Sequence, residues 1–310
     1  MRPAKMLLLL AVAVGLAAGC ARPAPAKTGE PVVVATMIDT EGSILGKMIV
    51  QLLEAEGIPV VDKTEFGTPD VLRKALEAKE VHLVVDYTGS GQYYHEGQDP
   101  AVWSDAAKGY EATKRLDEAK GIAWLTPAAA NNTESLAVKR EFAEKTGIRD
   151  LPAFAAYVNK GGAAKLIAAQ SYADNPLGLI GLEKAYGFTL RKDQLILLSS
   201  GNTAEMLKAL SEGTNGVNVS LVYGTDGALD EMKLLVLADP KGIPPVYLPA
   251  PVILAEKLAA YPRIEALLKP VFESLDLETL QRLNASVAFK GRDAREVGKE
   301  YLVSKGFLKK

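Results

Sequence analysis

The side chains that could do chemistry in this chain are mostly tyrosines, hydroxyls, amides and carboxylates in loops that follow predicted strands. The richest of these segments are residues 36–42, 86–94, 131–134, 171–175 and 223–227. These segments contain no cysteine, no lysine and no nucleophile beside a histidine. In open α/β sheets, ligands gather at the carboxyl ends of strands, so such loops predict a binding site for a small molecule.

Catalytic interpretations find little support in the motifs. His82 lies inside a predicted strand, and His95 lies in a polar loop. The segment 88–91 (Thr-Gly-Ser-Gly) is too short for a phosphate-binding P-loop and lacks its lysine. Glu134 and Asp226 could form the carboxylate pair of a glycoside hydrolase. We therefore expect no enzyme, with a lipid-anchored hydrolase as the alternative.

Composition excludes several other classes of protein. The 310 residues carry 36 Lys and Arg against 38 Asp and Glu, a formal charge of −2, which gives no electrostatic attraction to nucleic acid. A single cysteine excludes intramolecular disulfides, and two histidines leave little for a metal site. We expect no metal, no cofactor and a monomer, because a chain of this length can bury its own core.

The N-terminus has the pattern of an export signal. Arg2 and Lys5 precede an apolar run at 6–14 and small residues up to Cys20. Ala-Gly-Cys resembles the bacterial lipobox, which implies a signal peptide at 1–19, a lipidated Cys20 and a tether at 20–30. The expected location is the cell envelope, with the protein exported, lipid-anchored and facing the periplasm or the extracellular side. The alternative is an ordinary secreted protein in which Cys20 is a core residue.

Strand and helix patterns alternate over most of the remaining chain. Thr68 and Pro69 are typical of a helix N-cap and first turn, and a polar start at Asp39 precedes another helix with apolar residues at 44–53. Strands are predicted at 31–35, 58–61, 81–85, 136–138, 166–168, 195–198 and 217–223. Further helices are predicted at 151–160, 177–186, 204–212, 253–261, 263–274, 276–285 and 293–305. This order predicts an α/β fold with mainly parallel sheets covered by helices.

Seven motifs in a fixed order carry a resemblance to one family. They are Ile38–Gly42, Tyr87–Gly91, Trp124–Pro127 running into Asn131–Thr133, Ala185–Phe188, Tyr223–Gly227, Pro249–Val252 and Leu283–Ser286. In them the chain resembles the substrate-binding proteins of ABC importers for glycine betaine, choline and related quaternary amines, especially the osmotically inducible subgroup. The resemblance covers residues 31–308.

The resemblance implies a type II periplasmic-binding fold, with two lobes, two crossovers between them and hinge closure over the ligand. The expected first lobe is 31–133 plus the helical tail 232–310, and the expected second lobe is 134–231. The crossings are expected near 134–138 and 227–237.

The resemblance also implies which residues meet the ligand. A quaternary ammonium has no N–H to donate, so proteins hold it with aromatic faces, here the cage tyrosines Tyr87 and Tyr223. The full set of expected ligand-binding residues is Met37, Asp39, Tyr87, Thr88, Ser90, Asn132, Glu134, Tyr172, Asn175, Tyr223 and Asp226.

Three positions depart from the family pattern. Met37 stands where lysine is usual, Asn175 where arginine is usual, and Glu134 where an aromatic residue is usual. The two missing cations would hold a ligand carboxylate. We therefore hypothesise a cation without a carboxylate, such as choline, or a polar ligand such as a polyol or a sugar derivative, rather than glycine betaine. The alternative is weak glycine betaine binding through other residues.

The function implied by the resemblance is that of a receptor that delivers a solute to an ABC permease in the cytoplasmic membrane. The alternative with the same fold is a binding protein that signals to a membrane partner.

Overall fold

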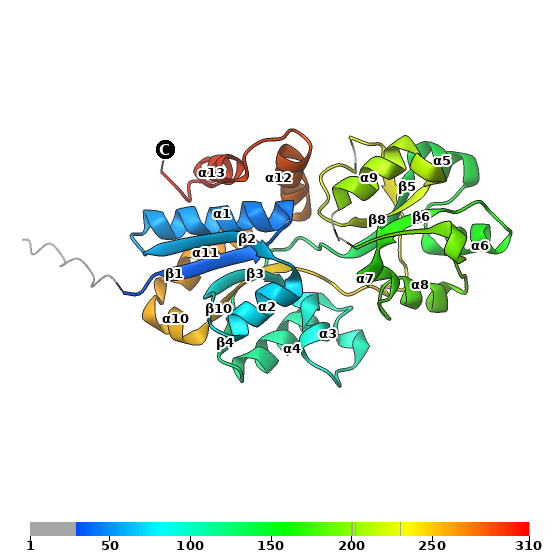
Figure 1. Cartoon of the computed structure of the whole chain (residues 1–310). Coiled ribbons are helices and arrows are strands. Elements are labelled where there is room, and N and C mark those ends of the chain that lie inside the picture. Colours follow the sequence, from blue (N-terminus) through cyan, green and yellow to red (C-terminus); the bar gives the residue numbers. More distant parts are fainter. Residues whose placement is uncertain (1–28, 200, 202, 230, 310) are drawn as a thin grey trace, which may run out of the picture.

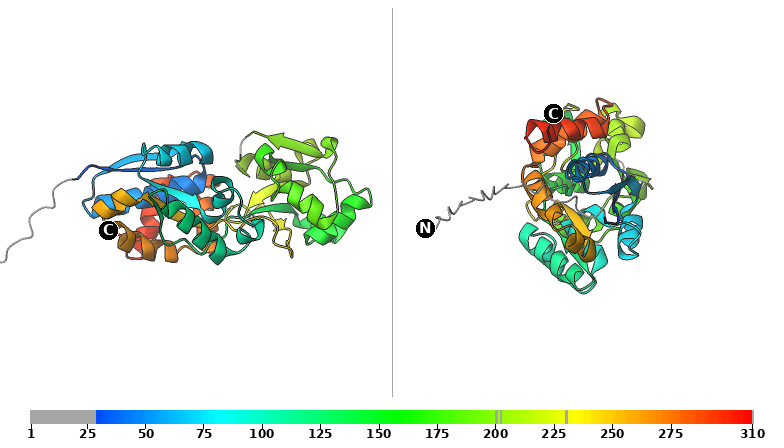
Figure 2. Two further views of the ribbon diagram at one scale, coloured as in Figure 1. Left: turned by 90° about the horizontal axis from the view of Figure 1, so that it is seen from below. Right: turned by 90° about the vertical axis from the view of Figure 1, so that its left-hand side faces the viewer.

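The structure, a computed structural model, describes residues 29–199, 201, 203–229 and 231–309. The described chain forms two lobes, each built on a five-stranded sheet (Figure 1). Two separate segments join the lobes, as further views show (Figure 2). The predicted signal peptide and Cys20 lie outside the described residues.

Lobe 1 holds the sheet with the strand order β2-β1-β3-β10-β4. Its strands are β1 (Val32–Met37), β2 (Val60–Gly67), β3 (Leu83–Tyr87), β4 (Ile122–Trp124) and β10 (Pro249–Leu254). Its helices are α1 (Thr40–Ala55), α2 (Pro69–Glu77), α3 (Gly91–Tyr94), α4 (Ala106–Glu118), α10 (Ala255–Ala260), α11 (Arg263–Glu273), α12 (Leu277–Ala288) and α13 (Ala294–Ser304), with short 3-10 helices η1 (Thr88–Ser90) and η2 (Pro100–Val102). Strand β10 runs antiparallel between β3 and β4.

Lobe 2 holds the sheet with the strand order β7-β6-β8-β5-β9. Its strands are β5 (Glu134–Lys139), β6 (Leu166–Ala169), β7 (Leu195–Leu198), β8 (Val219–Tyr223) and β9 (Leu234–Val236). Its helices are α5 (Arg140–Thr146), α6 (Leu151–Asn159), α7 (Gln170–Ala173), α8 (Leu179–Tyr186) and α9 (Thr203–Glu212), with short 3-10 helices η3 (Lys192–Gln194) and η4 (Thr214–Gly216). Strands β6, β7 and β8 are parallel, and β5 is antiparallel to β8.

Each lobe has its own hydrophobic core. One buried cluster lies entirely in lobe 2, and two others lie in lobe 1. Capping fixes where the first helix begins, because the Asp39 carboxylate accepts a hydrogen bond from the Gly42 N–H at 2.7 Å. Pro69 begins α2 as the sequence predicts. Two independent cores joined by thin connections are what a two-lobed receptor requires.

The first crossing between the lobes lies earlier in the chain than predicted, and the return crossing lies later. The first sheet ends at β4 and the second begins at β5, so residues 125–133 make the first crossing. Residues 237–248 make the return, because β9 still pairs with β5 and β10 is the next strand of lobe 1. The predicted return of the chain at residue 232 is therefore wrong. Strand β9, which has three residues, is too short to show an alternating pattern in the sequence.

No helix among the described residues is long and apolar enough to cross a membrane.

The carboxyl ends of β1 and β3 point toward lobe 2 (Figure 1). In lobe 2, the end of β8 lies beside the start of β5, directly after the first crossing. The loops that follow β1, β3 and β8 therefore meet where the two lobes face each other.

Candidate ligand-binding site

A buried carboxylate organises the place where the lobes join. Glu41 Oε1 accepts a 2.7 Å hydrogen bond from the Tyr87 hydroxyl, and Oε2 accepts one of 2.8 Å from Asn284 Nδ2. Asn132 Nδ2 lies 3.5 Å from Oε1, and its own Oδ1 accepts the Thr225 hydroxyl at 2.7 Å. These five residues, here the Glu41 cluster, connect α1, β3 and α12 of lobe 1 with the first crossing and the loop after β8.

The Glu41 cluster holds its carboxylate without a basic partner. Burial raises the pKa of Glu41 to about 7, while the hydrogen bonds from Tyr87 and Asn284 oppose that rise. No lysine or arginine is among the largest influences on this pKa. Neutral hydrogen-bond donors therefore hold Glu41, and its carboxyl group loses its proton near neutral pH.

A second group, here the tyrosine cluster, surrounds Glu134. It comprises Tyr93 from lobe 1, Tyr247 from the return crossing, Tyr172 and Tyr223 from lobe 2, and Glu134 itself at the start of β5. Glu134 lies directly opposite Tyr223 in the β5–β8 pair. After burial, which raises the pKa of each tyrosine, the charge of Glu134 is among the next influences on all four hydroxyls. Tyrosine hydroxyls from both lobes thus lie close enough to Glu134 for its charge to act on them.

Two polar atoms in the tyrosine cluster are buried without a hydrogen-bond partner among the described residues. They are Oε2 of Glu134 and the hydroxyl of Tyr172. Burial raises the pKa of Glu134 to about 7, and no neighbouring basic group in the described part of the chain opposes that rise. Buried polar atoms are normally paired, so these two are the points at which a ligand would complete the structure.

One direct hydrogen bond between the lobes lies beside the tyrosine cluster. Asn175 Nδ2, on lobe 2, donates a 2.8 Å hydrogen bond to the Tyr93 hydroxyl on α3. The hydroxyls of Tyr93 and Tyr247 are 3.4 Å apart, and Gln92 Nε2 donates to the Tyr247 hydroxyl at 2.5 Å. Tyr93 nevertheless remains 57% exposed, so its ring is available to a ligand.

The other predicted ligand residues have mainly local partners. Met37 is part of a buried core cluster of lobe 1, so the hypothesis that it faces the ligand finds no support in its position. Asp39 caps α1. Thr88 bonds Val246 O and Leu248 N, and Ser90 is buried with its hydroxyl bonded to the Asp86 carboxylate.

Asp226 folds back on its own lobe. Its carboxylate accepts the Thr203 hydroxyl at 2.7 Å and the Tyr223 N–H at 2.8 Å. Burial raises the pKa of Asp226 to about 6, against the effect of these hydrogen bonds. Neither bond involves Glu134, so the contacts do not indicate the carboxylate pair of a hydrolase.

Sequence reasoning missed several residues of both clusters. Glu41 and Asn284 lie inside recognised motifs but were not assigned to the site, and Tyr93 follows the Tyr87–Gly91 motif. Tyr247 has no signal in the sequence, because it lies on the return crossing, which was placed too early. Its ring packs closely over Gly89, where a Cβ atom would come within 2.7 Å of Tyr247 Cδ1.

The tyrosine cluster has the chemistry of a site for a cation without N–H groups. Aromatic faces and a carboxylate attract positive charge, and the cluster offers both in a partly buried setting. In the part of the chain that the structure describes, no three His, Cys, Asp or Glu side chains lie together in a way that could hold a metal ion.

Comparison with known proteins identifies the family. The family profile of OpuAC, the substrate-binding domain of ABC-type glycine betaine transport systems, matches residues 30–304. The chain is 43% identical over 286 residues to the glycine betaine-binding protein YehZ of Escherichia coli K12, covering 92% of this chain and 94% of that one. It is 33% identical over 269 residues to a glycine-betaine-binding protein of Pseudomonas aeruginosa PAO1, covering 85% and 84%.

Solved structures support the same assignment. The structure of apo YehZ from Escherichia coli superposes with a TM-score of 0.73 at 43% identity, covering 90% of this chain and all of that one. A choline-binding protein of an ABC transporter, in complex with choline, matches in fold with a TM-score of 0.62 at 15% identity, covering 89% of each chain. The expected type II two-lobed fold is thereby confirmed. The chain belongs to the family of substrate-binding domains of ABC-type glycine betaine transport systems.

Proposed function

We propose that this protein is the extracytoplasmic receptor of an ABC importer and binds a small quaternary amine, of the glycine betaine and choline class, at the tyrosine cluster. The observation that carries the proposal is the unpartnered, buried Oε2 of Glu134 with tyrosines of both lobes around it. A quaternary ammonium would supply the missing positive charge there and would lie against the rings, at roughly 0.5–2 kcal/mol for each ring.

The polar end of such a ligand would meet neutral donors. Gln92, Asn175 and the hydroxyl of Tyr93 lie together at the contact between the lobes. Neutral donors hold a carboxylate more weakly than lysine or arginine does. Glycine betaine should therefore bind with modest affinity, and choline should bind at least as tightly.

Calorimetry on purified protein, stripped of ligand by unfolding and refolding, tests this function. Glycine betaine, choline and a sugar panel would be titrated into the wild type and into Tyr223→Ala. Binding of either amine that is weakened at least tenfold by the substitution would support the proposal. Binding of a sugar alone would contradict it, and tight glycine betaine binding with weak choline binding would contradict the inferred preference.

The proposal extends to the cell envelope. The leader and Cys20 support an exported, lipid-anchored protein. The family supports delivery of its ligand to a permease in the cytoplasmic membrane. Replacing Cys20 by Ser should move the protein from the membrane fraction to the soluble fraction. A wild-type protein found only in the soluble fraction would exclude the anchor.

A further inference from the structure

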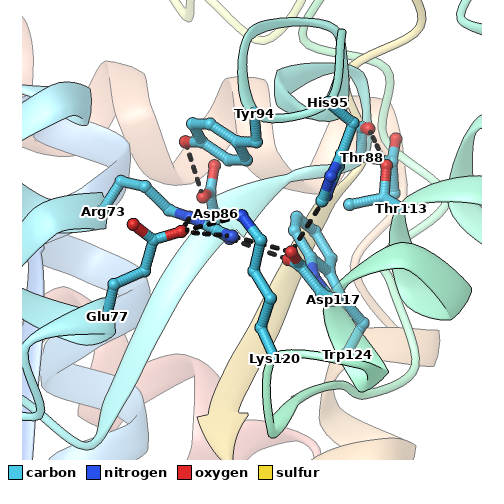
Figure 3. Close-up of polar contacts among 10 residues, drawn as sticks. All are labelled: Arg73, Glu77, Asp86, Thr88, Tyr94, His95, Thr113, Asp117, Lys120 and Trp124. Carbon is cyan, nitrogen blue, oxygen red and sulfur yellow. Dashed lines mark hydrogen bonds and ion pairs between the residues drawn. The ribbon is translucent and has the colours of Figure 1, made fainter. Parts of the chain in front are cut away.

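A buried ion pair lies beneath the segment of lobe 1 that follows β3 (Figure 3). Arg73 donates from both terminal nitrogens to the two carboxylate oxygens of Asp117, each at 2.7 Å, and the two residues are 5% and 0% exposed. Trp124 Nε1 also donates to Asp117 at 2.7 Å, and His95 Nε2 lies 3.0 Å from it. This arrangement fixes the plane of the Arg73 guanidinium.

The ring of Tyr94, on α3, stacks on this guanidinium. The central carbon of the Arg73 guanidinium lies 4.2 Å from the centre of the Tyr94 ring. The Tyr94 hydroxyl donates to Asp86 Oδ2 at 2.9 Å, as Figure 3 shows. Stacking on arginine and a hydrogen bond at the far end together determine the orientation of Tyr94.

Tyr94 is the immediate neighbour of the exposed tyrosine of the tyrosine cluster. Helix α3 contains only Gly91–Tyr94, and so short a helix depends on contacts with the rest of the protein for its stability. The segment before it is fastened where Thr113 donates to Thr88 O at 3.0 Å. The stacking of Tyr94 on Arg73 therefore fixes the C-terminal end of α3, the helix that presents Tyr93 toward lobe 2.

We infer that Arg73 is a positioning residue of the ligand site: its ion pair with Asp117 seats Tyr94 and thereby holds Tyr93 where it meets the ligand and Asn175. The inference rests on the proposed function for its effect on affinity. The orientation of α3 is measurable without any ligand.

A double-mutant cycle separates positioning from a general contribution to folding. Arg73→Lys keeps the charge but loses the planar fork, and Tyr93→Ala removes the side chain through which Arg73 acts. Choline and glycine betaine serve as probes. Arg73→Lys should weaken binding about tenfold in the wild-type background and less than about twofold beside Tyr93→Ala. Equal weakening in both backgrounds would overturn the inference.

Hydrogen exchange provides the ligand-independent measurement. In Arg73→Lys, the amides of 91–95 should exchange at least about tenfold faster, while those of α13 keep their rates. Unchanged exchange at 91–95 would overturn the inference even if the protein binds both amines. Faster exchange in a protein that binds neither amine would support the positioning of α3 and contradict the proposed function instead.

A second pair of variants leaves the ion pair intact and serves if Arg73→Lys does not fold. Tyr94→Leu removes the stacked ring and should reproduce both effects of Arg73→Lys. Tyr94→Phe keeps the ring and should rescue affinity to within about threefold of the wild type. Lys79→Gln, which breaks the exposed pair with Glu256, is the control and should change neither measurement. Equal effects of Leu and Phe at position 94 would contradict a role for the stack.

Discussion

The hydroxyl of Tyr87 donates a 2.7 Å hydrogen bond to the buried carboxylate of Glu41. Tyr87 ends β3 and Glu41 lies in the first turn of α1, so the bond joins two elements of lobe 1. The family motif predicts Tyr87 as a cage tyrosine, yet the residue is buried and its hydroxyl is already hydrogen-bonded to Glu41. Its contribution to stability should therefore exceed its contribution to affinity.

Tyr87→Phe tests this division. Loss of the hydroxyl leaves a buried carboxylate oxygen with one donor fewer, which should lower the free energy of unfolding by about 1–3 kcal/mol. Ligand affinity should fall less than in Tyr223→Ala. Urea denaturation and calorimetry on the same samples measure both quantities. An unchanged stability with a large loss of affinity would show that Tyr87 acts mainly on the ligand.

Stability should fall as pH rises from about 5 to about 7.5. Burial raises the pKa of Glu41 and of Glu134 from 4.5 to about 7, so in this range the folded state binds more protons than the unfolded state. The contribution of each group is fully present below pH 4.5 and is lost as pH rises to about 7, on the order of 1–3 kcal/mol for each. Denaturation at several pH values measures the slope.

Glu134→Gln is the matched variant for that slope. The amide does not titrate, so the fall in stability between pH 5 and pH 7.5 should become shallower. An identical slope in the wild type and the variant would mean that Glu134 is ionised throughout this range.

Glu134→Gln should also weaken binding of a quaternary amine at least about tenfold, because the only carboxylate within the tyrosine cluster is lost. In the wild type, the ionised form of Glu134 attracts the cation, so affinity should rise from pH 6 to pH 8. The variant should lose this dependence. Calorimetry at the two pH values measures it, and a wild-type affinity that falls with pH would contradict the role of Glu134.

Gly227 marks a close approach between the lobes. A Cβ atom there would lie 2.2 Å from Gln281 O and from Ala285 N on α12, which real contacts do not allow. Gly227→Ala should therefore push the loop after β8 away from α12 and destabilise the protein by about 2 kcal/mol or more. Gly109→Ala is the control, because a Cβ there meets only ordinary contacts of 3.5 Å and longer. Thermal unfolding of both variants decides the point, and equal melting temperatures would exclude the close approach.

Much of the fold was predictable because the relevant signals are local. Strand 195–198 has its observed bounds, and α2 begins at Pro69 as predicted. The sequence predicts no strand at β10, because Pro249 and Pro251 argue against a central strand, and it places residues 253–254 in a helix. Here β10 pairs on both sides, with β3 and with β4. Whether a strand can accommodate proline at these positions depends on its pairing with β3 and β4, which lie far away in the sequence.

The site was less predictable than the fold. Motifs identified the loops, and Glu134, Tyr172, Asn175 and Tyr223 do lie in or beside one cluster. Which side chain of a loop faces the other lobe depends on the packing of α3 and of the return crossing, which no local pattern encodes. Glu41 and Tyr247 entered only when the tertiary structure brought distant segments together.

A crystal structure of the protein with choline or glycine betaine would show whether the tyrosine cluster holds the ligand. We expect the quaternary nitrogen between the lobes, within about 6 Å of the ring centres of Tyr93 and Tyr223 and facing the Glu134 carboxylate. A ligand bound away from Glu134, or with its ammonium group directed out of the tyrosine cluster, would contradict it.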